Sequence, residues 1–196
     1  VTWHLYDDKP ELLVVHPLPI EDYVVGVVAS ELPPNWPIES LKAQAVAART
    51  YALWQKYRRL HLPYHLQASV LDQVYSGAER EHPDARLAAE QTRGVVVTWR
   101  RGLAQTLFHS CCGGRTEDSR KGWGGSVPYL LPVTCGTCTK APSFRWQADI
   151  DTTTLAAALA RWNLGRLQNI AAVAKTPTGR VTKFALVGTT RQRTAS

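Results

Sequence analysis

A proline-rich break at residues 32–37 separates two helix-forming stretches and determines the plan of the first half of the chain. The mainly apolar run at residues 20–29 precedes the break and leads into Glu31. Because proline disfavours a helical conformation of the residue before it, Pro33 predicts that the first helix ends at about Glu31. Residues 38–58 contain many good helix formers and neither glycine nor proline, so they predict a second, longer helix.

Glu31 is therefore expected at the carboxyl-terminal end of a helix, next to apolar residues. The negative end of the helix dipole disfavours the ionised form of a carboxyl group at that position. Removal of water by apolar neighbours acts in the same direction. A carboxyl group that keeps its proton near neutral pH can serve as a general acid, so Glu31 is a candidate catalytic residue. The alternative is a solvated glutamate at a helix end without a catalytic role.

The second predicted helix carries two cations within or beside its apolar face. At 100° per residue, Lys42 and Arg49 fall in or next to the arc of apolar side chains. That arc consists of Ile38, Leu41, Ala45, Ala48 and Ala52. The two cations either meet an anionic or polar group there or extend along the helix to reach the surface.

The composition is that of a globular domain, with 44% apolar and 20% charged residues. The net charge of +7 suits an anionic partner, and because no nucleic-acid motif surrounds the basic residues we do not expect nucleic acid to be that partner. No apolar run reaches the length of a membrane span. The chain has no methionine and starts at Val1, so we expect a trimmed fragment of a longer protein.

Several stretches resemble the signature of the SpoIID/LytB family, the family of stage II sporulation protein D. The stretches that carry the likeness are residues 23–33, 41–52, 73–77, 108–117 and 177–180. Together they extend the resemblance over most of the chain, from about residue 12 to residue 187. The block that contains Glu31 and the block that begins at Phe108 are the specific ones.

This resemblance implies a bacterial, sporulation-related cell-wall enzyme, a peptidoglycan lytic transglycosylase. Such a lyase cleaves the bond between N-acetylmuramic acid and N-acetylglucosamine without water and leaves a 1,6-anhydro end. Ordinary glycosidases use two carboxyl groups, whereas here the resemblance assigns both the acid and the base step to Glu31. No cofactor is required for this reaction. The resemblance also implies a location outside the cytoplasm, with export or a membrane anchor supplied by a missing N-terminal segment.

Other positions that match the family blocks are expected to bind the glycan strand. They are Lys42, Gln44, Arg49, Tyr75, His109, Ser110, Gly113, Gly114 and Thr116. The LytB branch of the family is linked to amidase enhancement, so a non-catalytic wall-binding module that stimulates a cell-wall amidase is the alternative function. A zinc hydrolase built on His109 and the cysteines is a third, weaker alternative.

The four cysteines, Cys111, Cys112, Cys135 and Cys138, allow two interpretations. Cys135 and Cys138 have the spacing of a zinc knuckle, and His109 and Cys112 could complete a tetrahedral set. An even number of cysteines in an oxidising compartment instead favours disulfides between the two pairs. A structural zinc ion and a disulfide therefore both remain open, and a catalytic zinc ion is not expected.

We expect an α+β fold with central helices, mixed or antiparallel sheet around them and a long functional loop. Residues 1–196 are predicted to form one catalytic domain, in which residues 109–145 could form a lobe. The substrate groove is expected between the end of the Glu31 helix and the loop at 109–116. Further predictions are a turn at 7–10 between strands, helices at 82–93 and 151–162, and hairpins at 95–108 and 170–187, with no element at 191–196.

Overall fold

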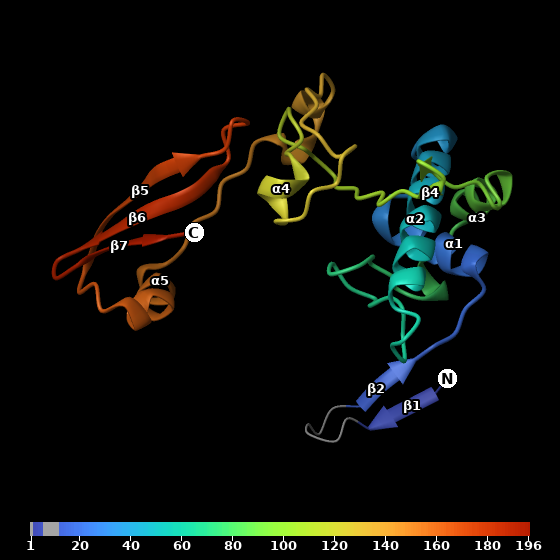
Figure 1. The fold of residues 1–196 in the computed structure, drawn as a ribbon, viewed down its shortest axis with the longest axis horizontal. Helices are drawn as coiled ribbons and strands as arrows, with labels where there is room; N and C mark the ends of the chain where they lie inside the picture. The colour runs from blue at the N-terminus through green and yellow to red at the C-terminus, as the bar shows by residue number, and fades with distance from the viewer. Residues whose placement is uncertain (1, 6–11) are drawn as a thin grey trace. The chain divides into compact units, whose positions relative to one another are not determined.

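The computed structural model describes residues 2–5 and 12–196 and divides into two compact units, Val1–Phe108 and His109–Ser196. Figure 1 shows that the first unit is mainly helical, whereas the second carries a three-stranded sheet. Helices together with small antiparallel sheets confirm the predicted α+β class. The second unit begins at the predicted start of the lobe but continues to the end of the chain. The single catalytic domain and the groove both remain predictions.

Three helices build the core of the first unit: α1 (Ile20–Glu31), α2 (Ile38–Arg58) and α3 (Pro83–Gln91). Valines of α1 pack against small side chains of the other two helices, and small side chains let helix backbones approach closely. The buried cluster consists of Val24, Val25, Val28, Leu41, Ala45, Ala85, Ala88 and Ala89. Removal of these apolar side chains from water stabilises the unit. Among the described helices, none is both long and apolar enough to cross a membrane.

The break between α1 and α2 forms as the prolines predict. Leu32, the residue before Pro33, leaves the helix with φ −124° and ψ 134°, and its N–H still donates to Val28 O at 3.0 Å. The prediction that the first helix ends at Glu31 is confirmed. The predicted helix that follows is also confirmed, because α2 begins at Ile38 directly after Pro37.

Asp72 anchors the connector that follows α2. Its carboxylate, fully shielded from solvent, forms an ion pair with Arg59 at 2.6 Å. It also accepts hydrogen bonds from Gln55 Nε2 at 2.7 Å, from Tyr51 Oη at 3.1 Å and from the Gln67 N–H at 2.9 Å. Burial alone would raise the pKa of Asp72, but these hydrogen bonds, led by that from Arg59, outweigh it and lower the pKa. The ionised carboxylate therefore holds the start of the segment that reaches Glu31.

The remaining strands of the first unit are short. β1 (Thr2–Leu5) pairs with β2 (Leu12–Val15), and the turn predicted at 7–10 lies outside the described residues. β3 (Thr98–Trp99) pairs with β4 (Gly102–Leu103) around two residues of positive φ, as in a tight hairpin turn. The prediction of longer strands at 95–99 and 103–108 is wrong.

The reason for these short strands is that their flanks bond to a helix. The Val97 N–H donates to Thr50 Oγ1 at 3.0 Å, and Thr106 Oγ1 donates to Ala47 O at 2.7 Å. Both partners belong to α2. The Val97 N–H, a backbone donor that a longer ladder could have paired, is thus satisfied by the helix, and the Thr106 hydroxyl fastens the other flank to it. The short helix η1 (Ala78–Arg80) precedes α3 in the same unit.

In the second unit, β5 (Leu167–Lys175), β6 (Val181–Gly188) and β7 (Gln192–Ala195) form one antiparallel sheet in this order. The predicted hairpin of β5 and β6 is confirmed, with Ile170 opposite Leu186. The prediction of no element at 191–196 is wrong, since β7 pairs with β6. The mostly polar, exposed residues of this edge strand lack the alternation by which strands are recognised.

The other helical segments of the second unit are short. They are α4 (Ser119–Gly122), η2 (Cys138–Lys140), η3 (Pro142–Phe144), α5 (Thr152–Leu159) and η4 (Ala160–Trp162). The predicted helix at 151–162 is confirmed as α5 and η4 together. Asp151 caps α5, because its Oδ1 accepts a hydrogen bond from the Thr154 N–H at 2.8 Å.

Candidate functional site

Glu31 lies half-buried at the last position of α1. Its Oε1 accepts a hydrogen bond from the Val74 N–H at 3.2 Å. The neighbouring Ser30 donates to Gly26 O at 2.8 Å and accepts from the Ser76 N–H at 3.1 Å. Within the described part of the first unit, Glu31 forms no ion pair. The end of α1 therefore presents an oriented carboxyl group that no described cation of this unit neutralises.

Tyr75 lies against α1, one residue from the N–H that bonds Glu31. Its ring covers Gly26, where a Cβ atom would lie 2.3 Å from Tyr75 Cε2, so only glycine fits. The ring also stacks on Tyr23, with centroids 5.4 Å apart. Tyr23 Oη in turn donates to the buried Gln73 at 3.1 Å, and burial raises the pKa of Tyr23 well above its usual value. The position of this predicted substrate contact is thus set by packing.

Lys42 and Gln44 both lie half-buried on α2. Lys42 reaches the surface, where its ammonium group pairs with Glu39 at 2.6 Å. This is the surface arrangement that the sequence left open for this cation. The Nε2 atom of Gln44 is shielded from solvent and has no partner among the described residues. Of the two, Gln44 therefore keeps an unused hydrogen-bond donor.

Arg49 is buried and does not reach the surface where a substrate would bind, because its side chain is only 1% exposed. Its guanidinium binds both carboxylate oxygens of Glu21, the shortest contact being 2.7 Å. It also donates to the carbonyl oxygens of Ala89 and Val95 at 3.1 Å, and to Thr92 Oγ1 at 3.5 Å. Since these partners occupy its donors inside the unit, we correct the prediction and assign Arg49 a structural role that joins the helices.

The loop at 109–116 begins the second unit. His109 and Ser110 are exposed, and Gly113 and Gly114 adopt φ values of 68° and 97° that favour glycine. The hydroxyl of Thr116 donates to the carbonyl oxygen of residue 131 at 3.2 Å and accepts from the N–H of residue 133 at 2.8 Å. Thr116 therefore fastens the loop to a neighbouring segment.

Three of the four cysteines, one of them in this loop, lie close together. The sulfur atoms of Cys112, Cys135 and Cys138 all lie within 4.8 Å of one another, and Cys138 Sγ is 3.2 Å from each of the other two. The Cys112 N–H also donates to Cys138 Sγ at 3.4 Å. All four cysteines are free thiols, and the exposed His109 is not part of the cluster. The three sulfurs could hold a metal ion, and the prediction that His109 completes the set is corrected.

The thiols of this cluster differ in acidity. Hydrogen bonds from Thr137 lower the pKa of Cys135 to about 6. The Cys112 N–H would lower the pKa of Cys138, but hydrogen bonding with the other thiols outweighs it and raises the pKa to about 12. A thiol that ionises near neutral pH supplies the thiolate form that binds metals.

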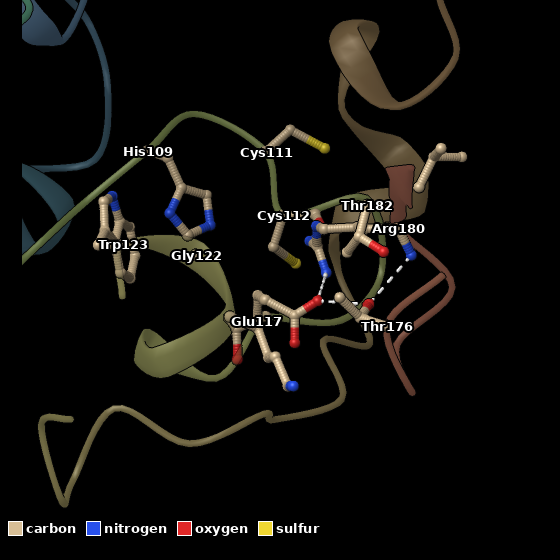
Figure 2. Close-up of a pocket in the computed structure, with 12 residues that line it drawn as sticks. His109, Cys111, Cys112, Glu117, Gly122, Trp123, Thr176, Arg180 and Thr182 are labelled. Atoms are coloured by element: carbon tan, nitrogen blue, oxygen red, sulfur yellow. Dashed lines mark hydrogen bonds and ion pairs between the residues drawn. The ribbon is translucent and has the colours of Figure 1, made fainter. Parts of the chain in front are cut away.

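A pocket of about 410 Å³ opens between the loop, α4 and the start of β6 in the second unit (Figure 2). Glu117 forms one wall, where it accepts hydrogen bonds from Thr178 and, at 2.7 Å, from Thr176. These hydroxyl groups lower the pKa of Glu117. Arg180 lies 3.7 Å from the Glu117 carboxylate and donates to Cys112 O at 2.8 Å. Arg180 thereby ties the β5–β6 turn to the cysteine loop.

The sequence patterns single out neither Lys121 nor Trp123 as a site residue. Lys121, Trp123 and Arg180 all line the pocket, together with the predicted His109 and Thr116. Two signals were available: the family-like turn at 177–180, and a tryptophan within the glycine-rich stretch that follows α4. Neither signal indicates that the turn and the loop face one pocket, because they are far apart in the chain.

The chain was compared with known protein families and with known proteins. Residues 8–99, which include Glu31, match the family model of SpoIID, stage II sporulation protein. With the relatives described next, this match shows that the chain belongs to the SpoIID family. The resemblance inferred from the sequence blocks is confirmed.

Three relatives show what the chain is similar to. An uncharacterized protein of Brachyspira hyodysenteriae is 40% identical over 68% of this chain and 36% of its own length. The amidase enhancer of Bacillus subtilis is 36% identical over 62% of this chain and 16% of its own length. Stage II sporulation protein D of Bacillus subtilis is 30% identical over 67% of this chain and 43% of its own length. The chain therefore spans less than half of each relative.

Proposed function

We propose that this protein is a peptidoglycan lytic transglycosylase in which Glu31 is the general acid and then the general base. The observation that carries the proposal is the half-buried carboxyl group at the end of α1, which is oriented by the Val74 N–H and forms no ion pair with the described residues of its unit. Family membership supports the same position, because Glu31 lies inside the matched residues.

The chemistry of this proposal needs one carboxyl group and no water. Glu31 donates its proton to the oxygen of the bond between N-acetylmuramic acid and N-acetylglucosamine, and the carbon–oxygen bond breaks. The carboxylate then takes the proton of the 6-hydroxyl group of the muramic acid unit, whose oxygen closes the 1,6-anhydro ring. The first proton leaves on the new hydroxyl group of the N-acetylglucosamine product, and the proton from the 6-hydroxyl group replaces it on Glu31, so the enzyme is unchanged after each cycle. Tyr75, Gln44 and the exposed loop residues His109 and Ser110 remain proposed substrate contacts.

Mass spectrometry of purified glycan strands digested by the protein tests this reaction. We expect products that end in 1,6-anhydro-muramic acid, each lighter by one water than the corresponding hydrolysis product. Hydrolysed ends would contradict the proposal, because they require an attacking water. The measurement needs no variant, so it depends only on the bond that is cleaved.

A second candidate is a cell-wall-binding module that stimulates an amidase, and the likeness to the amidase enhancer favours it. The same digestion separates the two functions when a cell-wall amidase is added. New anhydro ends without the amidase indicate a lyase. Faster release of wall peptides by the amidase, with no new glycan ends, indicates an enhancer. Either function acts on peptidoglycan and therefore places the protein outside the cytoplasm.

We also propose that the cysteine cluster binds a structural zinc ion. Thiolate sulfur and the Cys-x-x-Cys spacing of Cys135 and Cys138 suit zinc, and a structural site would fasten the loop at 109–116 to the segment that carries the pair. The proposed reaction does not use this ion. Its contribution would be to the stability of the second unit.

Metal analysis of protein prepared with zinc and a reductant tests the site. We expect about one zinc ion per chain, with loss of zinc in the Cys138→Ser variant and a lower melting temperature after chelation. The His109→Ala variant is the matched control and should keep its zinc, because His109 lies outside the cluster. Thiol titration of unfolded protein purified without reductant distinguishes the alternative: absence of zinc together with absence of free thiols would mean a disulfide.

A further inference from the structure

We propose that the three-stranded sheet of the second unit binds a linear anionic polymer whose repeating units carry phosphate. No acidic side chain follows Asp151 in the chain, whereas seven lysines and arginines do. The whole net charge of +7 therefore lies in residues 152–196, and the residues up to Asp151 are balanced. The inference concerns this stretch alone, so it depends neither on the chemistry of Glu31 nor on the cysteine cluster.

Six of these seven cations are exposed and form no ion pair with any residue that the structure describes. They are Arg161, Arg166, Lys175, Lys183, Arg191 and Arg193. The seventh, Arg180, pairs with Glu117. Like charges gathered in one small unit repel one another, and no described carboxylate pairs with these six. The unpaired cations therefore favour an anionic partner.

Three of the arginines lie around one corner of the sheet, where the segment before β5 meets the turn between β6 and β7. The Arg166 N–H donates to Thr189 Oγ1 at 3.0 Å, and the Thr189 N–H donates back to Arg166 O at the same distance. Arg191 O accepts from the Gly188 N–H at 2.9 Å, and Arg193 follows on β7. Backbone contacts thus hold this corner in place before a ligand binds, which lowers the cost of binding.

The type and spread of the cations indicate a polymer of phosphates. Five of the seven are arginines, whose planar guanidinium group can donate two parallel hydrogen bonds to phosphate oxygens. The corner lies at the end of β6, whereas Lys183 lies near its start and Lys175 pairs near Val181. A strand of eight residues is about 25 Å long, so one small anion cannot reach both ends. A polymer with repeated charges can.

The cations also lie on both faces of the sheet. Arg193 is opposite Leu186 in the pairing of β6 with β7, so the two share a face. Lys183 is three residues from Leu186 on the same strand and therefore lies on the other face. A flat lipid surface would contact one face, whereas a flexible polymer can pass round β7, the outer strand (Figure 1). Since no nucleic-acid motif surrounds the basic residues, the phosphates themselves are the recognised groups.

Calorimetric titration of the full chain with poly(glycerol phosphate) tests the surface. We expect the affinity to fall more than about 10-fold as the salt concentration rises from about 50 to 200 mM, because bound phosphates release counterions. The triple variant Arg166→Gln, Arg191→Gln, Arg193→Gln should bind about 10- to 50-fold more weakly than the parent. Its melting temperature without polymer should not fall, because the corner is held by backbone groups that the substitutions keep.

The matched control is the triple variant Lys121→Gln, Lys140→Gln, Arg145→Gln. It removes the same charge from exposed residues of the same unit, none of which belongs to residues 152–196. We expect its affinity to stay within about 3-fold of the parent's, since separated charges are screened at physiological salt. Equal losses in the two triple variants would overturn the proposal, as would a parent that does not bind the polymer.

Vesicles of phosphatidylglycerol separate a polymer from a membrane, because they present the same glycerol phosphate group on a flat surface. We expect them to bind more weakly than the polymer at equal phosphate concentration. Vesicles that bind as tightly as the polymer would overturn the proposal in favour of a lipid surface. Neither probe contains a glycosidic bond, so the result does not depend on whether the protein cleaves glycan strands.

Discussion

Glu31→Gln is expected to lower the release of anhydro-sugar ends by about 100- to 10,000-fold, the range typical for loss of a general acid or base. Glutamine has nearly the same shape, and its amide oxygen can still accept the hydrogen bond from the Val74 N–H. It cannot give its proton to the glycosidic oxygen or take one from the 6-hydroxyl group. The rate of appearance of anhydro ends, measured by mass spectrometry, tests this prediction.

The control for this variant is Glu39→Gln, which changes a glutamate that is 78% exposed in the same unit. We expect that variant to retain the activity of the parent. Denaturant unfolding should give the same transition for Glu31→Gln as for the parent, since Glu31 forms no ion pair with the residues that the structure describes in this unit and its hydrogen bond from Val74 can be kept. A Glu31→Gln protein that forms anhydro ends at the parent's rate would rule out the proposed role.

Arg49→Met is expected to lower the free energy of unfolding by about 3–5 kcal/mol, the usual cost of removing one partner of a buried ion pair. The Glu21 side chain is only 15% exposed and would lose its cation. The carbonyl oxygens of Ala89 and Val95 would lose their donor as well. Urea unfolding measures the loss, and the double variant with Glu21→Gln should recover part of it because no uncompensated charge remains.

The acid dependence of stability gives a second readout of the same pair. Burial raises the pKa of Glu21, but the hydrogen bonds from Arg49 and from the Gly94 N–H outweigh it and lower the pKa. A carboxyl group with a lowered pKa in the folded state stabilises above its unfolded value of about 4.3, and this contribution is lost as the pH falls. The free energy of unfolding of the parent should therefore decrease below that pH. In Arg49→Met the same decrease should be smaller, because the hydrogen bonds from Arg49 no longer lower the pKa of Glu21.

Arg58→Met is the matched control for the arginine variant. Arg58 is exposed on the same helix and lies 4.7 Å from the Trp54 ring, so its replacement should cost less than about 1 kcal/mol. If Arg49 instead bound the glycan, Arg49→Met would lower activity and leave the unfolding transition in place. That result would restore the substrate contact that the family blocks suggested.

Helix boundaries near the prolines could be predicted because they depend on local sterics. Pro33 restricts the residue before it whatever the rest of the chain does, so α1 ends at Glu31. The Cys-x-x-Cys spacing was also a local signal, and both of its cysteines belong to the cluster. The edge strand β7 was missed, because its residues carry no apolar alternation and the strand exists through pairing with β6.

The sequence by itself determined the two helices around the break, the place of Glu31 at the end of the first one, and the membership in the SpoIID family. The tertiary structure decided which polar residues bind to one another within each unit. Arg49 and Glu21 are 28 residues apart, and only the packing of α1 on α2 makes them an ion pair. Likewise, Arg180 meets Cys112 across 68 residues. Periodicity and local propensity report on neighbours along the chain, whereas such contacts depend on how distant elements pack together.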